Sequence, residues 1–110
     1  MLKLTPTDQS AIWLTVDFYI RPDMVSEAEE LFRRHVADGR ADRGNLFFSM
    51  WRREGDEAHF VSLEAWETKA DIDNHDAQPH HPVFLKRLSE IQAREKEVHF
   101  LNFFAEGTRV

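Results

Sequence analysis

The sequence predicts an α+β protein with the element order β-α-β-β-α-β, and two kinds of residue spacing lead to that prediction. Four short segments are rich in β-branched and aromatic residues or alternate apolar with polar residues, which is typical of strands. Between them, apolar residues recur every three or four positions, which is typical of helices with one buried face. This order is the ferredoxin-like arrangement, in which helices cover one face of a four-stranded antiparallel sheet.

A proline separates the first predicted strand from the first predicted helix. Residues 11–20, AIWLTVDFYI, form the strand, and Pro22 ends it because proline lacks the amide hydrogen that a sheet needs. Asp23 is the expected N-cap of a helix over residues 24–41. The apolar stripe of this helix consists of Met24, Ala28, Leu31, Phe32 and Val36.

Two further strands follow as a hairpin. Residues 45–53, NLFFSMWRR, and residues 58–66, AHFVSLEAW, are rich in the residue types that favour strands. Residues 54–57, EGDE, contain the glycine and aspartate that are typical of hairpin turns. We therefore expect these two strands to be antiparallel neighbours.

The second helical region is expected in two pieces. Thr68 caps a short helix that ends near His75, and Asp71 stands where the second residue of such a cap is found. A connection that contains histidine and proline spans residues 76–82. A second apolar stripe then predicts another helix, with Val83, Phe84, Leu88 and Ile91 on its buried face. Residues 98–104, VHFLNFF, form the last strand.

Length and charge limit the classes of function. A chain of 110 residues predicts one domain over residues 11–110, preceded by a flexible leader over residues 1–10. The net charge of -6, without a basic cluster, argues against nucleic-acid binding. No apolar run approaches the ~20 residues of a membrane helix, and no signal peptide is visible, so we expect a cytoplasmic protein that does not bind membranes. The absence of cysteine excludes disulfides and thiolate chemistry.

The face of the sheet without helices is expected to be rich in large side chains. Trp13, Tyr19, Trp51 or Phe103 would lie on it, depending on the register of the strands. A bare aromatic sheet face of this size is unusual in a monomer. Because two-fold dimers are the commonest oligomers, we expect a homodimer that buries this face.

Three short motifs carry a resemblance to a known family. Glu64, Trp66 and His75 stand at the spacing of the pattern E-x-W-x-(polar)-x-x-a-(apolar)-x-x-H, and residues 78–84, QPHHPVF, are similar to a histidine-containing segment that opens the next helix. Residues 21–23, RPD, stand where the same proteins have K-P-G. On these motifs the chain, over about residues 12–104, resembles antibiotic-biosynthesis-monooxygenase domains.

The resemblance implies a dimeric α/β barrel with a pocket between the sheet and the helices of each subunit. It also implies an enzyme that oxidises a phenol, a quinol or a polyketide-like aromatic with molecular oxygen and no bound cofactor. Two departures bear on this expectation. The family's E-P-G-C turn is here Asp42-Arg43-Gly44-Asn45, and Leu85 stands where haem-degrading relatives have a histidine, which disfavours a role in haem degradation.

The expected catalytic residues are His75, His80 and Glu64. His75 follows Ile72 by three positions, so both lie on one helix face and the imidazole can accept a proton from a phenol. Alternatively, His75 binds the last carbonyls of its helix, and His80 is a capping or surface histidine. Glu64 on an inward strand face would orient a histidine or act as a base, or it would pair with an arginine at the dimer interface.

The expected substrate-binding residues would enclose an aromatic ring: Trp66, Trp51, Phe48, Asp17 and His81. Trp66 is equally suited to packing, and Asp17 to the dimer interface. Because the prolines beside His80 and His81 favour extended backbone, we expect only one of these two rings to enter the pocket. No metal site is expected, because H-D-x-x-x-H-H, over residues 75–81, is not a standard ligand spacing.

Two other functions remain open at this point. An isomerase or lyase on the same scaffold would use the same histidine and glutamate to move a proton beside a carbonyl, without oxygen. A dimer that binds a small molecule without catalysis would need no convergent polar groups in its cavity. Turnover under strict anaerobiosis separates the first alternative from the monooxygenase.

Overall fold

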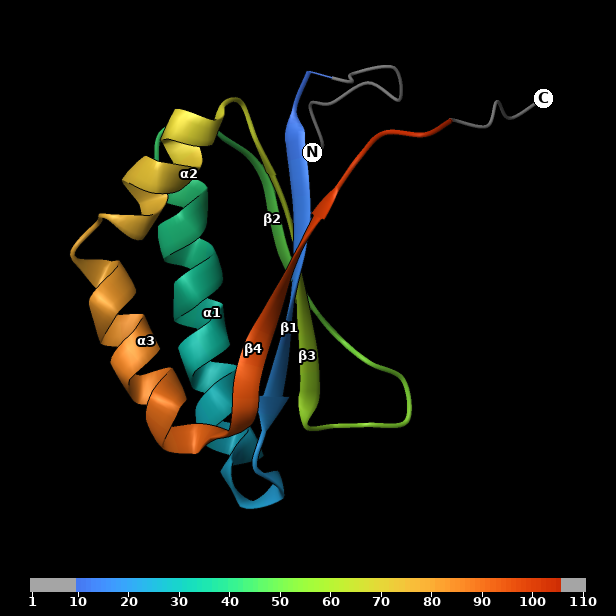
Figure 1. Cartoon of the computed structure of the whole chain (residues 1–110). Coiled ribbons are helices and arrows are strands. Elements are labelled where there is room, and N and C mark those ends of the chain that lie inside the picture. Colours follow the sequence, from blue (N-terminus) through green and yellow to red (C-terminus); the bar gives the residue numbers. More distant parts are fainter. Residues whose placement is uncertain (1–9, 106–110) are drawn as a thin grey trace.

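The chain folds as one four-stranded sheet with its helices packed on one face (Figure 1). This computed structural model describes residues 10–105, so residues 1–9 of the predicted leader lie outside the described residues. Within residues 10–105, no helix is both long and apolar enough to cross a membrane. The elements are β1 (Ile12–Ile20), the 3-10 helix η1 (Pro22–Met24), α1 (Val25–Ala41), β2 (Asn45–Arg52), β3 (His59–Trp66), α2 (Lys69–Asp76), α3 (His80–Ile91) and β4 (Gln92–Leu101).

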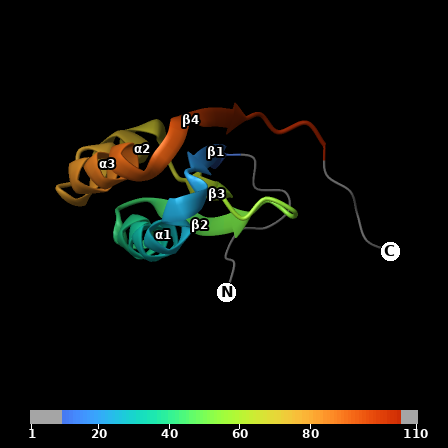
Figure 2. The same cartoon turned by 90° about the horizontal axis from the view of Figure 1, so that it is seen from below.

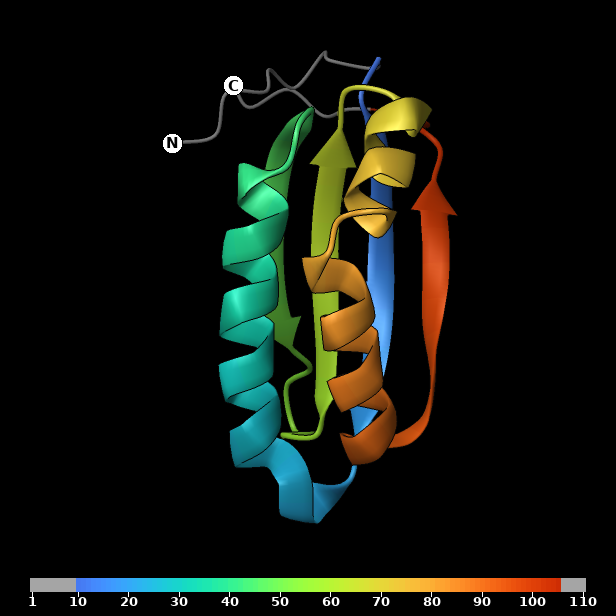
Figure 3. The same cartoon turned by 90° about the vertical axis from the view of Figure 1, so that its left-hand side faces the viewer.

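The strands are antiparallel and lie in the order β2-β3-β1-β4 (Figure 3). β1 is central, so Leu14 has Glu64 of β3 as one neighbour and Phe100 of β4 as the other. α1, α2 and α3 all lie on one face of the sheet, and the opposite face carries no helix (Figures 1 and 2). The predicted ferredoxin-like α+β fold is therefore confirmed.

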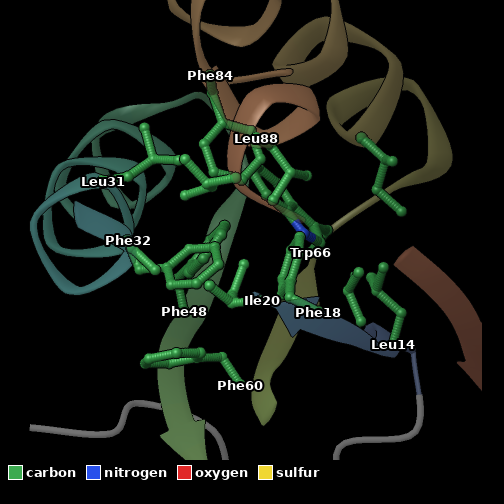
Figure 4. Close-up of a cluster of buried hydrophobic side chains, with 14 residues drawn as sticks. Leu14, Phe18, Ile20, Leu31, Phe32, Phe48, Phe60, Trp66, Phe84 and Leu88 are labelled. Carbon is green, nitrogen blue, oxygen red and sulfur yellow. The ribbon is translucent and has the colours of Figure 1, made fainter. Parts of the chain in front are cut away.

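The buried core is built from the alternation that predicted the first strand. In β1, Leu14, Val16, Phe18 and Ile20 are buried, because successive side chains of a strand point to opposite faces. They meet aromatic residues from the helices, and Phe18 packs against Phe32 with ring centroids 4.9 Å apart (Figure 4). Full burial of a side chain of this size stabilises the fold by roughly 1.5–3 kcal/mol.

Two predicted helix boundaries were wrong. Asp23 does not cap α1; it lies inside η1, whose first position is Pro22, and α1 begins at Val25 with no side-chain cap. Proline suits the first turn of a helix because its φ is already helical and its missing N–H is not needed there. The connection predicted over residues 76–82 is shorter, since α3 already begins at His80.

The last strand begins six residues earlier than predicted, at Gln92 instead of Val98, and ends at Leu101. Its first residues, QAREKE, have no apolar alternation because β4 lies at the edge of the sheet and pairs only with β1. Charged side chains are common on edge strands, where they oppose pairing with other chains. Their sequence pattern therefore resembles that of a loop.

The cap predicted for the short helix α2 is confirmed. Thr68 Oγ1 accepts a hydrogen bond from the Asp71 amide at 3.2 Å and donates one to Asp71 Oδ2 at 2.8 Å. Arg43 also donates to Asp71, from Nε to Oδ1 at 3.0 Å. The hydrogen bond with Thr68, followed by the one with Arg43, lowers the pKa of Asp71. These hydrogen bonds join the start of α2 to the turn that ends at Gly44.

Replacement of Gly44 by alanine is expected to destabilise the protein by about 1–3 kcal/mol, for two reasons. Gly44 has a φ of 79°, which strains any L residue, and an added Cβ would collide with the side chain of Asp71. Gly55→Ala is the matched control, because Gly55 has a φ of 84° but open space around it. Urea unfolding should show a larger loss for Gly44→Ala; equal losses would contradict the collision.

The face without helices carries both aromatic and charged side chains. Trp51 is 61% exposed there, and Trp13 packs against Phe47 on the same face, with ring centroids 6.0 Å apart. Asp17 accepts a hydrogen bond from His59 at 2.7 Å, and His99 lies 3.6 Å from its other oxygen. This face therefore combines the large side chains expected of an interface with a group of polar side chains around Asp17.

Candidate active site

A cavity of ≈ 280 Å³ lies on the helix-covered side of the sheet, between β1, β3 and β4 and the three α-helices. Most of its wall is apolar, and consists of Leu14, Val16, Phe18, Ile72, Phe84, Val98 and Phe100. The polar residues that line it are His35, Glu64, Lys69, His75, Asp76, His81 and Lys96. An apolar cavity on which a few polar groups converge is the usual form of a small-molecule site.

A larger hollow of ≈ 360 Å³ lies where α1 meets β2. It is lined by Trp51 and by the ion pair of Arg52 with Glu29, whose charged atoms are 2.7 Å apart. No histidine is among the described residues that line it. Because histidine is the side chain best suited to proton transfer near neutral pH, the smaller cavity is the better candidate active site.

His75 lies in the last turn of α2 and is 4% exposed. Its Nδ1 atom is 2.6 Å from Oδ2 of Asp42. An ionised carboxylate can only accept, so Nδ1–H donates this bond, and in the neutral form of the ring the lone pair is on Nε2. The structure thus places His75 on the cavity wall with a fixed tautomer, instead of on the last carbonyls of its helix.

Asp42 is a site residue that the sequence patterns did not indicate. It is the C-cap of α1 and lies 33 positions before His75 and 38 before His80. Its Oδ2 atom also accepts a hydrogen bond from Nε2 of His80 at 2.9 Å. No local spacing connects an aspartate that ends one helix with histidines on two others. One signal was available, because Asp42 stands at the acidic position of the family's E-P-G-C turn.

His80 and His81 are both on the first turn of α3, not in the extended segment that the neighbouring prolines predicted. His81 lines the cavity, whereas His80 turns toward Asp42 and does not line it. Burial lowers the pKa of His81. Adjacent helical residues point about 100° apart, which is why only one of the two rings reaches the cavity.

Glu64 lies on the cavity wall and is 5% exposed. It accepts hydrogen bonds from Ser62 Oγ at 2.9 Å and from Trp66 Nε1 at 3.1 Å. Burial raises the pKa of its carboxyl, and the two hydrogen bonds oppose that rise. Glu64 is therefore a buried acid that is protonated to a higher pH than an exposed glutamate.

Glu64→Gln is expected to make the protein more stable than the wild type above the usual glutamate pKa, and the difference should grow as the pH rises. A raised pKa in the folded state means that folding favours the protonated carboxyl. The contribution of Glu64 to the free energy of unfolding is therefore fully present at low pH and is lost as the pH rises through the folded pKa. Glutamine removes this titration and can still bond both Ser62 and Trp66. Urea unfolding of both proteins at several pH values measures this difference in stability. A difference that does not change with pH would contradict the raised pKa of Glu64.

The structure separates the predicted ring-enclosing residues into two groups. Trp66 and Phe48 are buried on the helix side, and their rings lie 4.9 and 6.0 Å from that of His75. Both support His75 but do not line the cavity. By strand alternation Trp51 and Asp17 belong to the opposite face of the sheet, because each stands an odd number of positions from a helix-facing neighbour in its strand. At the β2 edge the Trp51 side chain also lines the hollow beside α1. Trp51 and Asp17 cannot enclose the same ring as Phe48.

His35 is a second site residue that was not among those expected from the sequence. Its ring lies parallel to that of Phe84, with centroids 3.7 Å apart and an interplanar angle of 7°. Burial, with smaller effects from His75, His81 and His80, lowers its pKa to about 3, so the ring is neutral. One signal was available: His35 follows Leu31 and Phe32 by four and three positions, and so belongs to the apolar stripe of α1.

The sequence model of the antibiotic biosynthesis monooxygenase family matches residues 12–87. YcnE of Bacillus subtilis (strain 168), which carries the provisional name of a monooxygenase, is 30% identical over 78 residues, or 71% of this chain and 78% of YcnE.

Solved structures share the fold at lower identity. A crystal structure described as an antibiotic biosynthesis monooxygenase superposes with a TM-score of 0.81 at 21% identity, over 86% of this chain and 99% of the other. Rv0793 from Mycobacterium tuberculosis superposes with a TM-score of 0.80 at 22% identity, over 90% of this chain and 100% of the other. Identities this low support the fold alone.

Proposed function

Because the chain belongs to the antibiotic biosynthesis monooxygenase family, we propose that it is a cofactor-independent monooxygenase of small aromatic substrates. The substrate would be a phenol, a quinol or a polyketide-like aromatic, and the oxidant would be molecular oxygen. The observation that carries this proposal is the Asp42–His75 pair, which presents an oriented base to an apolar cavity.

The first step is removal of a phenolic proton by Nε2 of His75. Asp42 holds the proton of the ring on Nδ1 and stabilises the imidazolium that forms, since the two atoms are 2.6 Å apart. The resulting phenolate gives up an electron to oxygen far more readily than the phenol does. His75 is therefore the residue whose loss should affect turnover most.

The overall reaction balances without an added reductant. A phenol with a free para position takes one oxygen atom into the ring and becomes a quinone, while the second oxygen atom leaves as water. The substrate supplies all four electrons that oxygen needs, and two of its hydrogen atoms leave in the water. An enzyme of this kind needs only a base, an apolar site and room for both reactants.

The remaining cavity groups suit binding of a flat aromatic molecule. Phe84, stacked on His35, and Phe18 provide apolar surfaces for a ring. The protonated form of Glu64, which its burial favours, can donate a hydrogen bond to a substrate oxygen. A volume of ≈ 280 Å³ lies near the lower end of small-molecule cavities, which favours substrates of one or two rings.

We also propose that the single domain over residues 11–110 works as a homodimer that buries the sheet face carrying Trp13 and Trp51. Size-exclusion chromatography with light scattering should give twice the 13.0 kDa of the chain, about 26 kDa, at micromolar concentration. Trp51→Asp should shift the population toward the monomer, because an unpaired charge in an interface is costly. A monomeric wild-type protein would contradict the dimer.

Comparison of turnover in air with turnover under strict anaerobiosis tests the proposed activity. Tag-free protein would be offered 1-naphthol, menadiol and polycyclic phenols, with an autoxidation blank for each. The monooxygenase predicts product in air only. Product without oxygen would indicate the isomerase or lyase instead, and ligand binding without any product would indicate a binding protein.

A further inference from the structure

We propose that Asp42, His75 and His80 form a binding site for one divalent transition-metal ion, of which Zn²⁺ and Co²⁺ are the probes of choice. Two imidazoles and one carboxylate are a donor set that suits zinc, cobalt and nickel. The local spacing of histidines over residues 75–81 did not indicate this site, because its carboxylate comes from the distant end of α1. The proposal goes beyond the oxygenase activity, which needs no metal.

The three donor atoms already converge on one point. Nδ1 of His75 and Nε2 of His80 lie 2.6 and 2.9 Å from the same oxygen of Asp42, and all three ligand atoms lie within 4.8 Å of one another. A metal ion that binds each atom at about 2.1 Å with tetrahedral angles holds neighbouring ligand atoms about 3.4 Å apart. The ion would replace the protons that these rings now donate, with a small outward shift of the donors.

The relative position of the two rings agrees with shared coordination. Their centroids are 5.6 Å apart, and the planes are inclined by 48°. Two imidazoles on one ion, each with its centroid a little over 3 Å from the metal, lie about 5 Å apart at tetrahedral angles. The rings therefore need little movement, and they are fixed at the end of α2 and the start of α3.

The surroundings favour a cation. The side chains of His75 and Asp42 are only 5% and 11% exposed, and that of His80 is 23% exposed, so water competes weakly for the donors. Asp42 caps the C-terminal end of α1, where the helix dipole places partial negative charge. Three protein ligands leave a fourth coordination position for water, as in zinc sites that the protein does not close.

Metal binding at this site would inhibit the proposed oxygenase. A metal ion on Nδ1 of His75 forces the remaining ring proton onto Nε2, because a neutral imidazole carries only one N–H. The lone pair that accepts the phenolic proton is then absent. This consequence rests on the proposed function, whereas metal binding itself does not.

Isothermal titration calorimetry of tag-free, chelator-treated protein with Zn²⁺, and the visible absorption of added Co²⁺, test the site. We expect one ion per chain, with affinity lowered more than about 100-fold by Asp42→Asn and by His80→Gln, since loss of a supporting contact alone costs up to that factor. His99→Gln is the matched control, because Asp17, Glu97 and His99 are a separate group of potential ligands on the other sheet face, and loss of His99 leaves the Asp42 site intact. The His99→Gln variant should bind Zn²⁺ and Co²⁺ with the affinity of the wild type.

A second measurement does not depend on whether the variants fold. Wild-type crystals soaked in Zn²⁺ should show an anomalous peak between Asp42, His75 and His80. A peak between His75, Asp76 and His81, which also converge, would overturn the proposed ligand set, as would unchanged affinity in both variants. If the metal ion binds without inhibiting any measured turnover, only the proposed inhibition of the oxygenase is contradicted.

Discussion

His75→Gln is expected to lower kcat/KM for oxygen-dependent turnover by at least about 100-fold, the lower end of the contribution of a positioned general base. Glutamine can still bond Asp42 but cannot accept a proton from a phenol at neutral pH. The loss should fall on kcat with KM little changed, because the interaction is made in the transition state. Steady-state oxygen uptake measures it, with His99→Gln as the control.

Asp42→Asn should lower the same kcat by about 10–100-fold, without removing the imidazole. The asparagine amide can donate to Nδ1 of His75 and so favour the wrong tautomer, in which Nε2 carries the proton. Activity of either variant equal to that of the wild type would mean that another group, such as His81 or Glu64, removes the proton.

The largest expected effect on stability comes from His35. Its folded pKa of about 3 lies far below the usual 6.5, so below pH 6.5 the unfolded chain takes up a proton that the folded protein excludes. Stability is therefore full above pH 6.5 and is lost progressively as the pH falls toward 3. Between pH 6.5 and 5 the loss is about 1–2 kcal/mol, or roughly a 15-fold change in the unfolding equilibrium.

Urea unfolding at pH 6.5 and pH 5 should show this loss in the wild type and not in His35→Leu. The comparison uses the change with pH, so any constant cost of repacking against Phe84 cancels. His99→Leu, which removes a histidine on the sheet face opposite His35, is the control and should behave as the wild type. An equal loss in the wild type and in His35→Leu would show that His35 is not the titrating group.

Most of the fold was predictable because its signal is local. The alternation in residues 11–20 and the apolar stripe of α1 each follow from one buried face, and Thr68 and Asp71 mark the start of α2 within four residues. The start of β4 was not predictable, because an edge strand that pairs only with β1 tolerates charged residues on both faces.

The candidate site was predictable only in part, since its geometry depends on contacts between distant segments. His75, Glu64 and His81 reach the cavity, as their placement beside apolar residues suggested. Asp42 acts from another helix, and no local pattern connects it with His75. Trp51 was a candidate for both the pocket and the helix-free face, because a strand's alternation shows which residues share a face but not which face meets the helices.

Incorporation of ¹⁸O from labelled oxygen gas is the most direct test of oxygen chemistry at the His75 cavity. Tag-free protein treated with a chelator, without flavin, would turn over 1-naphthol, and the product would be quenched within seconds and analysed by mass spectrometry. One ¹⁸O atom per quinone, with one molecule of oxygen consumed and the label lost in His75→Gln, is the predicted result. Product that carries no ¹⁸O, or that forms equally fast in His75→Gln, would contradict a cofactor-independent monooxygenase with His75 as its base.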